Sequence, residues 1–176
     1  MDITYSQKNG VKITGKNVAV AIDGSADTKA DVLLFSEPQS GLKSLTSFDG
    51  PGEFEVKGCM IDAIKTGEDK TAYRVDIEEV RLGYLPAFPG QEDKTADALS
   101  GCEVLFVPLS GETVEKVTKL IGSYEPKIVI PISYNDDELK AFLAEIGAKD
   151  VAAVEKYKFQ RKDIADDKQE VVVLAG

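Results

Sequence analysis

Residues 49–58 read DGPGEFEVKG, a tight turn that leads directly into a strand. Pro51 fixes one φ angle, and the glycines on either side of it permit positive φ, which is the chemistry of a turn. The residues that follow are rich in β-branched and aromatic side chains and are interrupted by glycines and charges. They predict a largely antiparallel meander of strands over 53–57, 59–64, 71–77 and 80–85.

Two apolar stretches precede this turn. Residues 18–22 (VAVAI) predict a buried strand that ends at Asp23-Gly24, and residues 31–35 (DVLLF) predict another that ends at Ser36. Residues 171–174 (VVVL) predict a terminal strand. Most of the strands therefore lie in the first half of the chain.

The second half of the chain alternates strands with helices. Residues 104–107 (VLFV) and 128–130 (IVI) predict continuous apolar strands. The helix between them is expected to begin at Ser110 and to end at Gly122. Strand, helix and strand in this order imply parallel pairing through right-handed crossovers.

A second helix follows the strand over 128–130. Asn135 and Glu138 have the spacing of a capping box, and Gly147 is expected to close the helix. Its predicted buried face consists of Leu139, Phe142, Leu143 and Ile146. With a shorter helix over 93–99, these elements predict one α/β domain spanning 1–176, with two packed mixed sheets and helices outside.

Composition narrows the classes of function. The chain has 176 residues, a net charge of −10 and no histidine. The acidity argues against binding nucleic acid or an anionic membrane surface. Cys59 and Cys102 make no disulfide framework and are expected to be buried free thiols. No secretory signal or membrane-spanning run is evident, so we expect a cytoplasmic protein.

Four stretches resemble one family in the same order and spacing: MDITYS at 1–6, KADVLLFS at 29–36, DGPGEFEVKG at 49–58 and PKIVIP at 126–131. They are similar to small zinc-dependent hydrolases of the metallo-β-lactamase fold, in the ascorbate-6-phosphate lactonase-like branch. This resemblance implies a four-layered αββα sandwich. The run at 49–58 is the most specific of the four.

The metal-binding motif of that family is degenerate in this chain. The family places H-x-H-x-D-H directly after the strand that here ends at Ser36. Glu37 and Gln39 stand at the first two histidines, Gly41 at the aspartate and Leu42 at the last histidine. The resemblance also puts Ala87 at a bridging aspartate and Ser133 at a final histidine. We therefore expect no metal and no cofactor.

Three further residues fall near the expected site. Lys8 stands about where the family has the histidine of an opening Gly-His-Ser. Asp23 matches an acid that would orient a ligand, but without a ligand its expected role is a turn or a cap. Tyr134 follows Ser133 and would lie at the pocket.

Three functions remain open at this point. The first is a non-catalytic binding or structural protein, whose partner would be another protein or further copies of itself. The second is a hydrolase with a rebuilt, metal-free or carboxylate-based site made by Glu37, Gln39, Ser133, Tyr134 and Lys8. The third is a metallohydrolase scaffold engineered to lack histidine. An open pocket with Lys8 and Tyr134 pointing inward would favour the second.

Overall fold

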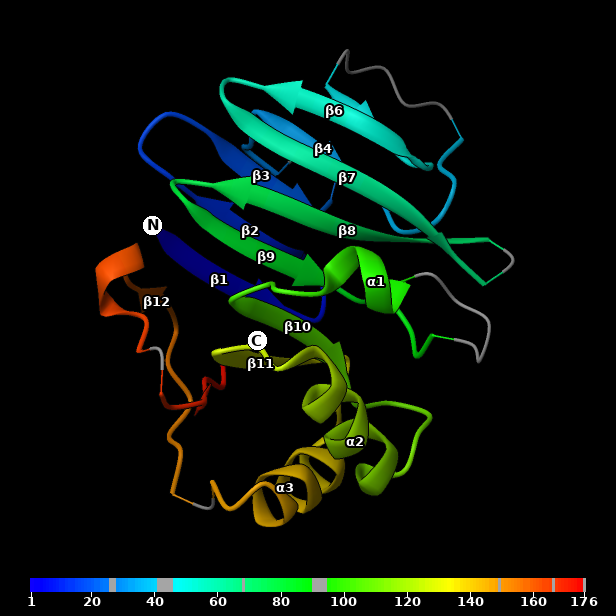
Figure 1. The fold of residues 1–176 in the computed structure, drawn as a ribbon. Coiled ribbons are helices and arrows are strands. Elements are labelled where there is room, and N and C mark those ends of the chain that lie inside the picture. The colour runs from blue at the N-terminus through cyan, green and yellow to red at the C-terminus, as the bar shows by residue number, and fades with distance from the viewer. Residues whose placement is uncertain are drawn as a thin grey trace.

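The computed structural model describes residues 1–25, 28–40, 46–67, 69–89, 95–148, 150–165 and 167–175. Its strands form two sheets that pack face to face (Figure 1). Helices lie beside one of the sheets (Figure 1). The predicted class, an α/β sandwich of two mixed sheets, is confirmed.

The first sheet has the strand order β12-β1-β2-β3-β4-β5. Neighbours pair antiparallel from β12 to β3, and β3, β4 and β5 pair in parallel. The strands predicted over 18–22 and 31–35 are present as β3 and β4. The bounds are β1 Asp2–Ser6, β2 Gly10–Thr14, β3 Ala19–Ile22, β4 Val32–Leu34, β5 Ser47–Phe48 and β12 Tyr157–Lys158.

The second sheet has the order β13-β11-β10-β9-β8-β7-β6. Strands β6 to β9 form the predicted antiparallel meander, and β9, β10, β11 and β13 pair in parallel. The bounds are β6 Gly52–Val56, β7 Cys59–Thr66, β8 Lys70–Ile77, β9 Val80–Tyr84, β10 Val104–Pro108, β11 Ile128–Ile132 and β13 Glu170–Val171.

Two hydrophobic clusters hold the layers together. The larger one lies between the sheets and includes Ile13, Ile61 and Phe106. The second joins one face of the second sheet to helices α1 (Thr95–Leu99), α2 (Val114–Tyr124) and α3 (Asp136–Glu145). A short 3-10 helix, η1 (Arg161–Asp163), precedes β13. No helix in the described ranges has the length and apolar character needed to cross a membrane.

Helix α2 differs from its prediction at both ends. Its N-cap is Thr113, whose side chain accepts from the Lys116 N–H, and not Ser110. Ser110 instead donates its N–H to the carbonyl of Ser133, which ties it to the end of β11. The helix continues past Gly122 and ends where Glu125 adopts a left-handed φ of 51°.

Helix α3 follows its prediction. Asn135 and Glu138 form the capping box, with both hydrogen bonds at 2.9 Å. Gly147 has a φ of 77° just beyond the last turn, as a helix-closing glycine should. Phe142 is fully buried in the second cluster, and Leu139, Leu143 and Ile146 pack partly buried against it.

The end of the chain joins both sheets. Strand β12 pairs with β1 in the first sheet, and β13 pairs with β11 in the second. The strand predicted over 171–174 is shorter than expected: β13 ends at Val171, and Leu174 makes only an isolated bridge with Val154. The helix predicted over 93–99 is described from Thr95 onward, because 93 and 94 lie outside the described residues.

Candidate functional site

Most of the predicted site residues follow strands that lie in parallel pairs. Asp23 follows β3, Glu37 and Gln39 follow β4, and Ser133 follows β11. Functional groups in α/β folds gather at such carboxyl ends. Two groupings of contacts are found there.

The first grouping surrounds Asp23, which has a φ of 54°. Its Oδ1 accepts from the Ser36 N–H at 2.7 Å and its Oδ2 accepts from Tyr84 Oη at 2.6 Å. Tyr84 is buried, and this burial, together with the adjacent Asp23 carboxylate, holds the pKa of the phenol well above its ordinary value. Asp23 therefore links the residue that follows β4 to a buried phenol of β9.

Glu37 and Gln39 lie together in that loop, exposed to solvent. Glu37 Oε1 lies 2.7 Å from Lys70 Nζ, and this ammonium lowers the pKa of the carboxyl. Gln39 donates its side-chain amide to the Glu37 carbonyl at 3.1 Å and its backbone N–H to Asp49 Oδ2 at 2.8 Å. Asp49, the first residue of DGPGEFEVKG, thus fastens this loop. Gly41 and Leu42 lie outside the described residues.

The second grouping is an open pocket of about 430 Å³ beside the ends of β10 and β11. Tyr5 Oη accepts from the Ser133 N–H at 2.8 Å, and Gln7 Nε2 donates to the Tyr134 carbonyl at 2.7 Å. The rings of Tyr5 and Tyr134 lie 6.4 Å apart at 44°. The pocket is lined by Tyr5, Gln7, Ser110, Ser133, Tyr134, Asn135 and Glu138, which we call the Tyr5–Ser133 pocket.

Ser133 has an unusual backbone for its residue type. Its φ is 50°, in the left-handed region that few residues other than glycine occupy. Its N–H bonds to Tyr5, and its carbonyl accepts from the Ser110 N–H at 2.9 Å, so both backbone groups are held. This arrangement fixes an exposed serine at the edge of the pocket.

The pocket lining and the hydrogen bonds link the predicted residues in two pairs. Ser133 and Tyr134 share the Tyr5–Ser133 pocket, whereas Glu37 and Gln39 share the loop after β4. Lys8 is exposed in the turn between β1 and β2, and Ala87 is half-buried beyond β9. Neither belongs to the described residues that line the pocket.

Sequence reasoning missed Tyr5, Gln7 and Tyr84. Tyr5 and Tyr84 sit in strands, where a buried aromatic side chain predicts core packing and nothing more. A buried tyrosine hydroxyl needs a hydrogen-bond partner, and this requirement is the only signal in the sequence for a polar role of Tyr5 and Tyr84. The partners themselves come from distant parts of the chain.

The residues present do not fit a zinc ion. Zinc takes nitrogen, sulfur or carboxylate ligands, usually four in a tetrahedron. Glu37 is paired with Lys70, and the side chains at Gln39, Ala87 and Ser133 are an amide, a methyl and a hydroxyl. Over the described ranges, no group of at least three His, Cys, Asp or Glu side chains could hold a metal ion.

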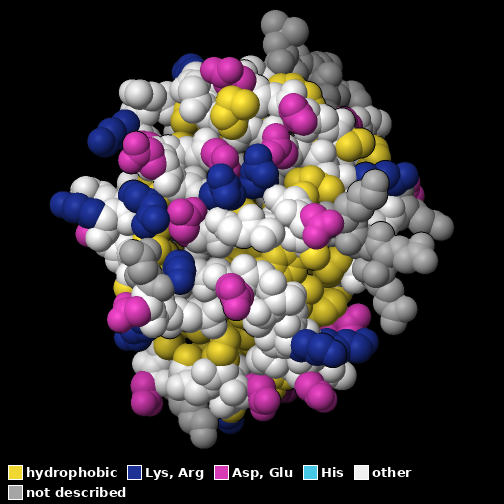
Figure 2. Space-filling model, in the orientation of Figure 1, with side chains coloured by type: hydrophobic (Ala, Val, Ile, Leu, Met, Phe, Trp, Pro, Cys, Tyr) yellow, Lys and Arg dark blue, Asp and Glu magenta, His cyan; other side chains and the backbone are white. Residues whose placement is uncertain are grey.

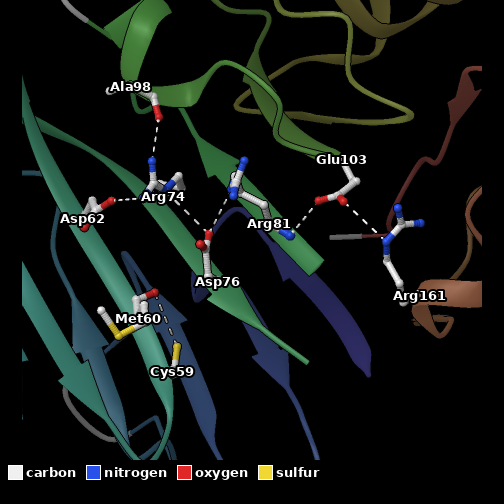
Figure 3. Close-up of polar contacts among 9 residues, drawn as sticks. All are labelled: Cys59, Met60, Asp62, Arg74, Asp76, Arg81, Ala98, Glu103 and Arg161. Atoms are coloured by element: carbon white, nitrogen blue, oxygen red, sulfur yellow. Dashed lines mark hydrogen bonds and ion pairs between the residues drawn. The ribbon is translucent and has the colours of Figure 1, made fainter. Parts of the chain in front are cut away.

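A third polar cluster crosses the second sheet (Figure 3). Asp76 Oδ1 lies 3.6 Å from Arg74 Nε and 3.5 Å from Arg81 Nε, and Arg74 also pairs with Asp62. Figure 2 shows acidic and basic side chains interspersed on this face. Each carboxylate in the cluster already has a cationic partner, so the network ties elements together. Its further contacts are Arg74 to the Ala98 carbonyl, the Arg81 N–H to Glu103, and Arg161 to Glu103.

No protein-family profile and no curated protein matches this chain. Among solved structures, it is similar to a Thermotoga maritima protein described as a zinc-dependent hydrolase of the metallo-β-lactamase superfamily. That match has a TM-score of 0.78 and 17% identity, over 99% of this chain and 100% of the other.

Two further structures are similar. One is described as a metal-dependent hydrolase from Parabacteroides distasonis, with a TM-score of 0.63 and 15% identity over 97% of this chain and 91% of that one. The other is the metallo-β-lactamase fold protein YhfI from Bacillus subtilis, with a TM-score of 0.61 and 7% identity over 98% and 95%. At such low identities these likenesses show the fold, which is that of the metallo-β-lactamases.

Proposed function

We propose that this chain is a non-catalytic binding protein built on the metallo-β-lactamase fold. The proposal rests on the ion pair of Glu37. Among the expected ligand positions, only Glu37 has a side chain that could bind a metal ion. Its carboxylate is exposed and paired with Lys70 at 2.7 Å. With no histidine anywhere in the chain, the usual zinc ligands of the fold are missing.

The Tyr5–Ser133 pocket supports binding more than catalysis. The only carboxylate among its described lining residues is Glu138, whose Oε2 accepts from the Asn135 N–H in the capping box. Serine needs a neighbouring base to act as a nucleophile. Neither Lys8 nor a histidine supplies one beside Ser133, so this pocket offers binding groups without an activated nucleophile.

A hydrolase with a rebuilt site is the second candidate. It is favoured by one observation, the placement of Ser133 and Tyr134 at an open pocket. Glu37 and Gln39 are not among the described residues that line that pocket, which counts against it. For either function we propose a cytoplasmic location, which the two buried free cysteines support.

The test uses protein without a histidine tag. Zinc content after dialysis is measured by mass spectrometry, and hydrolysis of lactones, β-lactams and phosphodiesters is followed with and without EDTA. We expect less than stoichiometric zinc and rates equal to the buffer blank. A rate proportional to protein concentration would overturn the proposal, and its abolition by EDTA would identify a metalloenzyme.

A further inference from the structure

We propose that the Tyr5–Ser133 pocket binds a neutral, polyhydroxylated small molecule of one or two sugar rings. This inference rests on the proposed binding function and names the ligand class for it. It is argued from the charge, the hydrogen-bonding groups, the aromatic side chains and the size of the pocket.

The charge around the pocket disfavours anions. Its described lining residues include no lysine or arginine, and they include the carboxylate of Glu138. Asp136 and Asp137 stand in the same first turn of α3. A phosphate or carboxylate ligand would meet these like charges without a cation to pair with.

Apart from Glu138, the described residues that line the pocket have neutral side chains, and all of these can form hydrogen bonds. Ser110 and Ser133 present hydroxyls, each of which can donate and accept. Gln7 uses its amide nitrogen on the Tyr134 carbonyl, which leaves its oxygen as an acceptor. Asn135 uses its oxygen on the Glu138 N–H, which leaves its amide nitrogen as a donor. Such mixed donors and acceptors match the hydroxyl groups of a polyol.

The aromatic side chains and the volume of the pocket also suit a sugar. Tyr5 and Tyr134 line the pocket beside these polar groups, so an apolar ring surface adjoins the hydroxyls. A sugar ring has the same two-sided character, with C–H faces and a rim of hydroxyls. The volume of about 430 Å³ falls within the range of small-molecule sites.

Titrations followed by two-dimensional ¹H–¹⁵N NMR test the proposal. The probes are D-glucose, N-acetyl-D-glucosamine, maltose and myo-inositol, with glucose 6-phosphate as the anionic counterpart and spermidine as a cation. We expect at least one neutral probe to shift the amide signals of Ser110, Ser133 and Asn135, and glucose 6-phosphate to bind more weakly than glucose. Failure of every neutral probe at tens of millimolar, or tighter binding of the phosphate or of spermidine, would overturn it.

A matched pair of variants separates binding from folding. Ser133→Gly removes the hydroxyl at a position whose left-handed backbone favours glycine, so the fold is retained. It should weaken binding about 2- to 10-fold, the worth of one net hydrogen bond. Glu125→Gly relieves a φ of 51° outside the pocket and should leave affinity unchanged. Equal affinity in both variants would count against the assigned pocket.

Failure of this inference is distinguishable from failure of the proposed function. Hydrolysis of a probe would overturn the non-catalytic proposal, although the ligand class would stand. Absence of binding together with background hydrolysis would overturn the ligand class alone.

Discussion

Tyr84 Oη lies 2.6 Å from Asp23 Oδ2, so a buried phenol holds the carboxylate that, in the family this sequence resembles, would orient a metal ligand. The other oxygen of Asp23 accepts from the Ser36 N–H at 2.7 Å, immediately before Glu37. Asp23 therefore joins Tyr84 of β9 to the backbone directly after β4.

Replacing Tyr84 with phenylalanine should lower the free energy of unfolding by about 1–3 kcal/mol, because the Asp23 carboxylate loses a buried donor. Urea denaturation followed by circular dichroism measures the change. Tyr157→Phe is the control, since its 3.1 Å bond to Glu170 is exposed, and it should cost less than about 1 kcal/mol. Equal effects of both variants would contradict the role given to the Tyr84–Asp23 bond.

Both cysteines should be unreactive in the folded protein. Burial raises the pKa of Cys59 to about 11 and that of Cys102 to about 12. At pH 8 the thiolate fraction is therefore far smaller than in the unfolded chain, and the sulfurs are also sheltered. Ellman's reagent should label neither thiol in native protein and both in guanidinium. Rapid labelling of native protein would show that one of the cysteines is accessible.

Truncation of Phe142 should be costly. Its side chain is fully buried between α3 and the second sheet, so Phe142→Ala should reduce stability by about 3–5 kcal/mol. Chemical denaturation gives the value, and Lys140→Ala, an exposed position on the same helix, should change it by less than about 0.5 kcal/mol. A loss below 1 kcal/mol for Phe142→Ala would mean that this helix packs differently.

The C-terminal end of α2 offers a stabilising substitution. Glu125 has a φ of 51°, where a side chain is strained and glycine is not, so Glu125→Gly should add about 1 kcal/mol. Lys119→Gly lies inside the same helix and should remove about 1 kcal/mol. The midpoint temperatures of thermal unfolding of the two variants should shift in opposite directions. Shifts in the same direction would refute the assigned helix end.

Introducing metal ligands at the six positions named from the family resemblance tests that mapping. A variant carrying Glu37→His, Gln39→His, Gly41→Asp, Leu42→His, Ala87→Asp and Ser133→His should take up zinc that survives dialysis. Histidine is among the residues that tolerate the left-handed backbone found at Ser133. The control replaces the exposed Lys119, Glu155 and Lys162 with histidine and should retain no zinc. A folded restored variant without zinc would argue against the mapping.

The sequence predicted those parts of the fold whose signals are local. The β6–β9 meander is marked by its own glycines and alternating side chains, and the α3 cap by Asn135 and Glu138. The start of α2 was misplaced because Ser110 and Thr113 are both good caps. The choice between them depends on the Ser110–Ser133 hydrogen bond, which the sequence does not reveal. Strands β5 and β12 are too short to have a pattern of their own.

The site was harder to predict because its contacts join residues that are far apart in the sequence. The Tyr5–Ser133 pocket is built by residues 128 positions apart, and its polar partners were unremarkable in sequence. Family resemblance pointed to Ser133, Tyr134 and Glu37, but it gave no sign of the ion pair between Glu37 and Lys70 on β8.

The pairing of β12 and β13 with opposite sheets has a consequence for biosynthesis. Until Tyr157 leaves the ribosome, β1 has no neighbour on its outer side, and until Val171 follows, the same holds for β11. A nascent chain thus carries the open β1 edge for most of its synthesis and the open β11 edge from residue 132 until residue 171, a state in which chains associate edge to edge. Closing contacts such as Ile3 with Tyr157 also span nearly the whole chain, which slows folding. The yield of native protein should therefore depend on how quickly the last segment is made and on the chaperones that shield the edges until then.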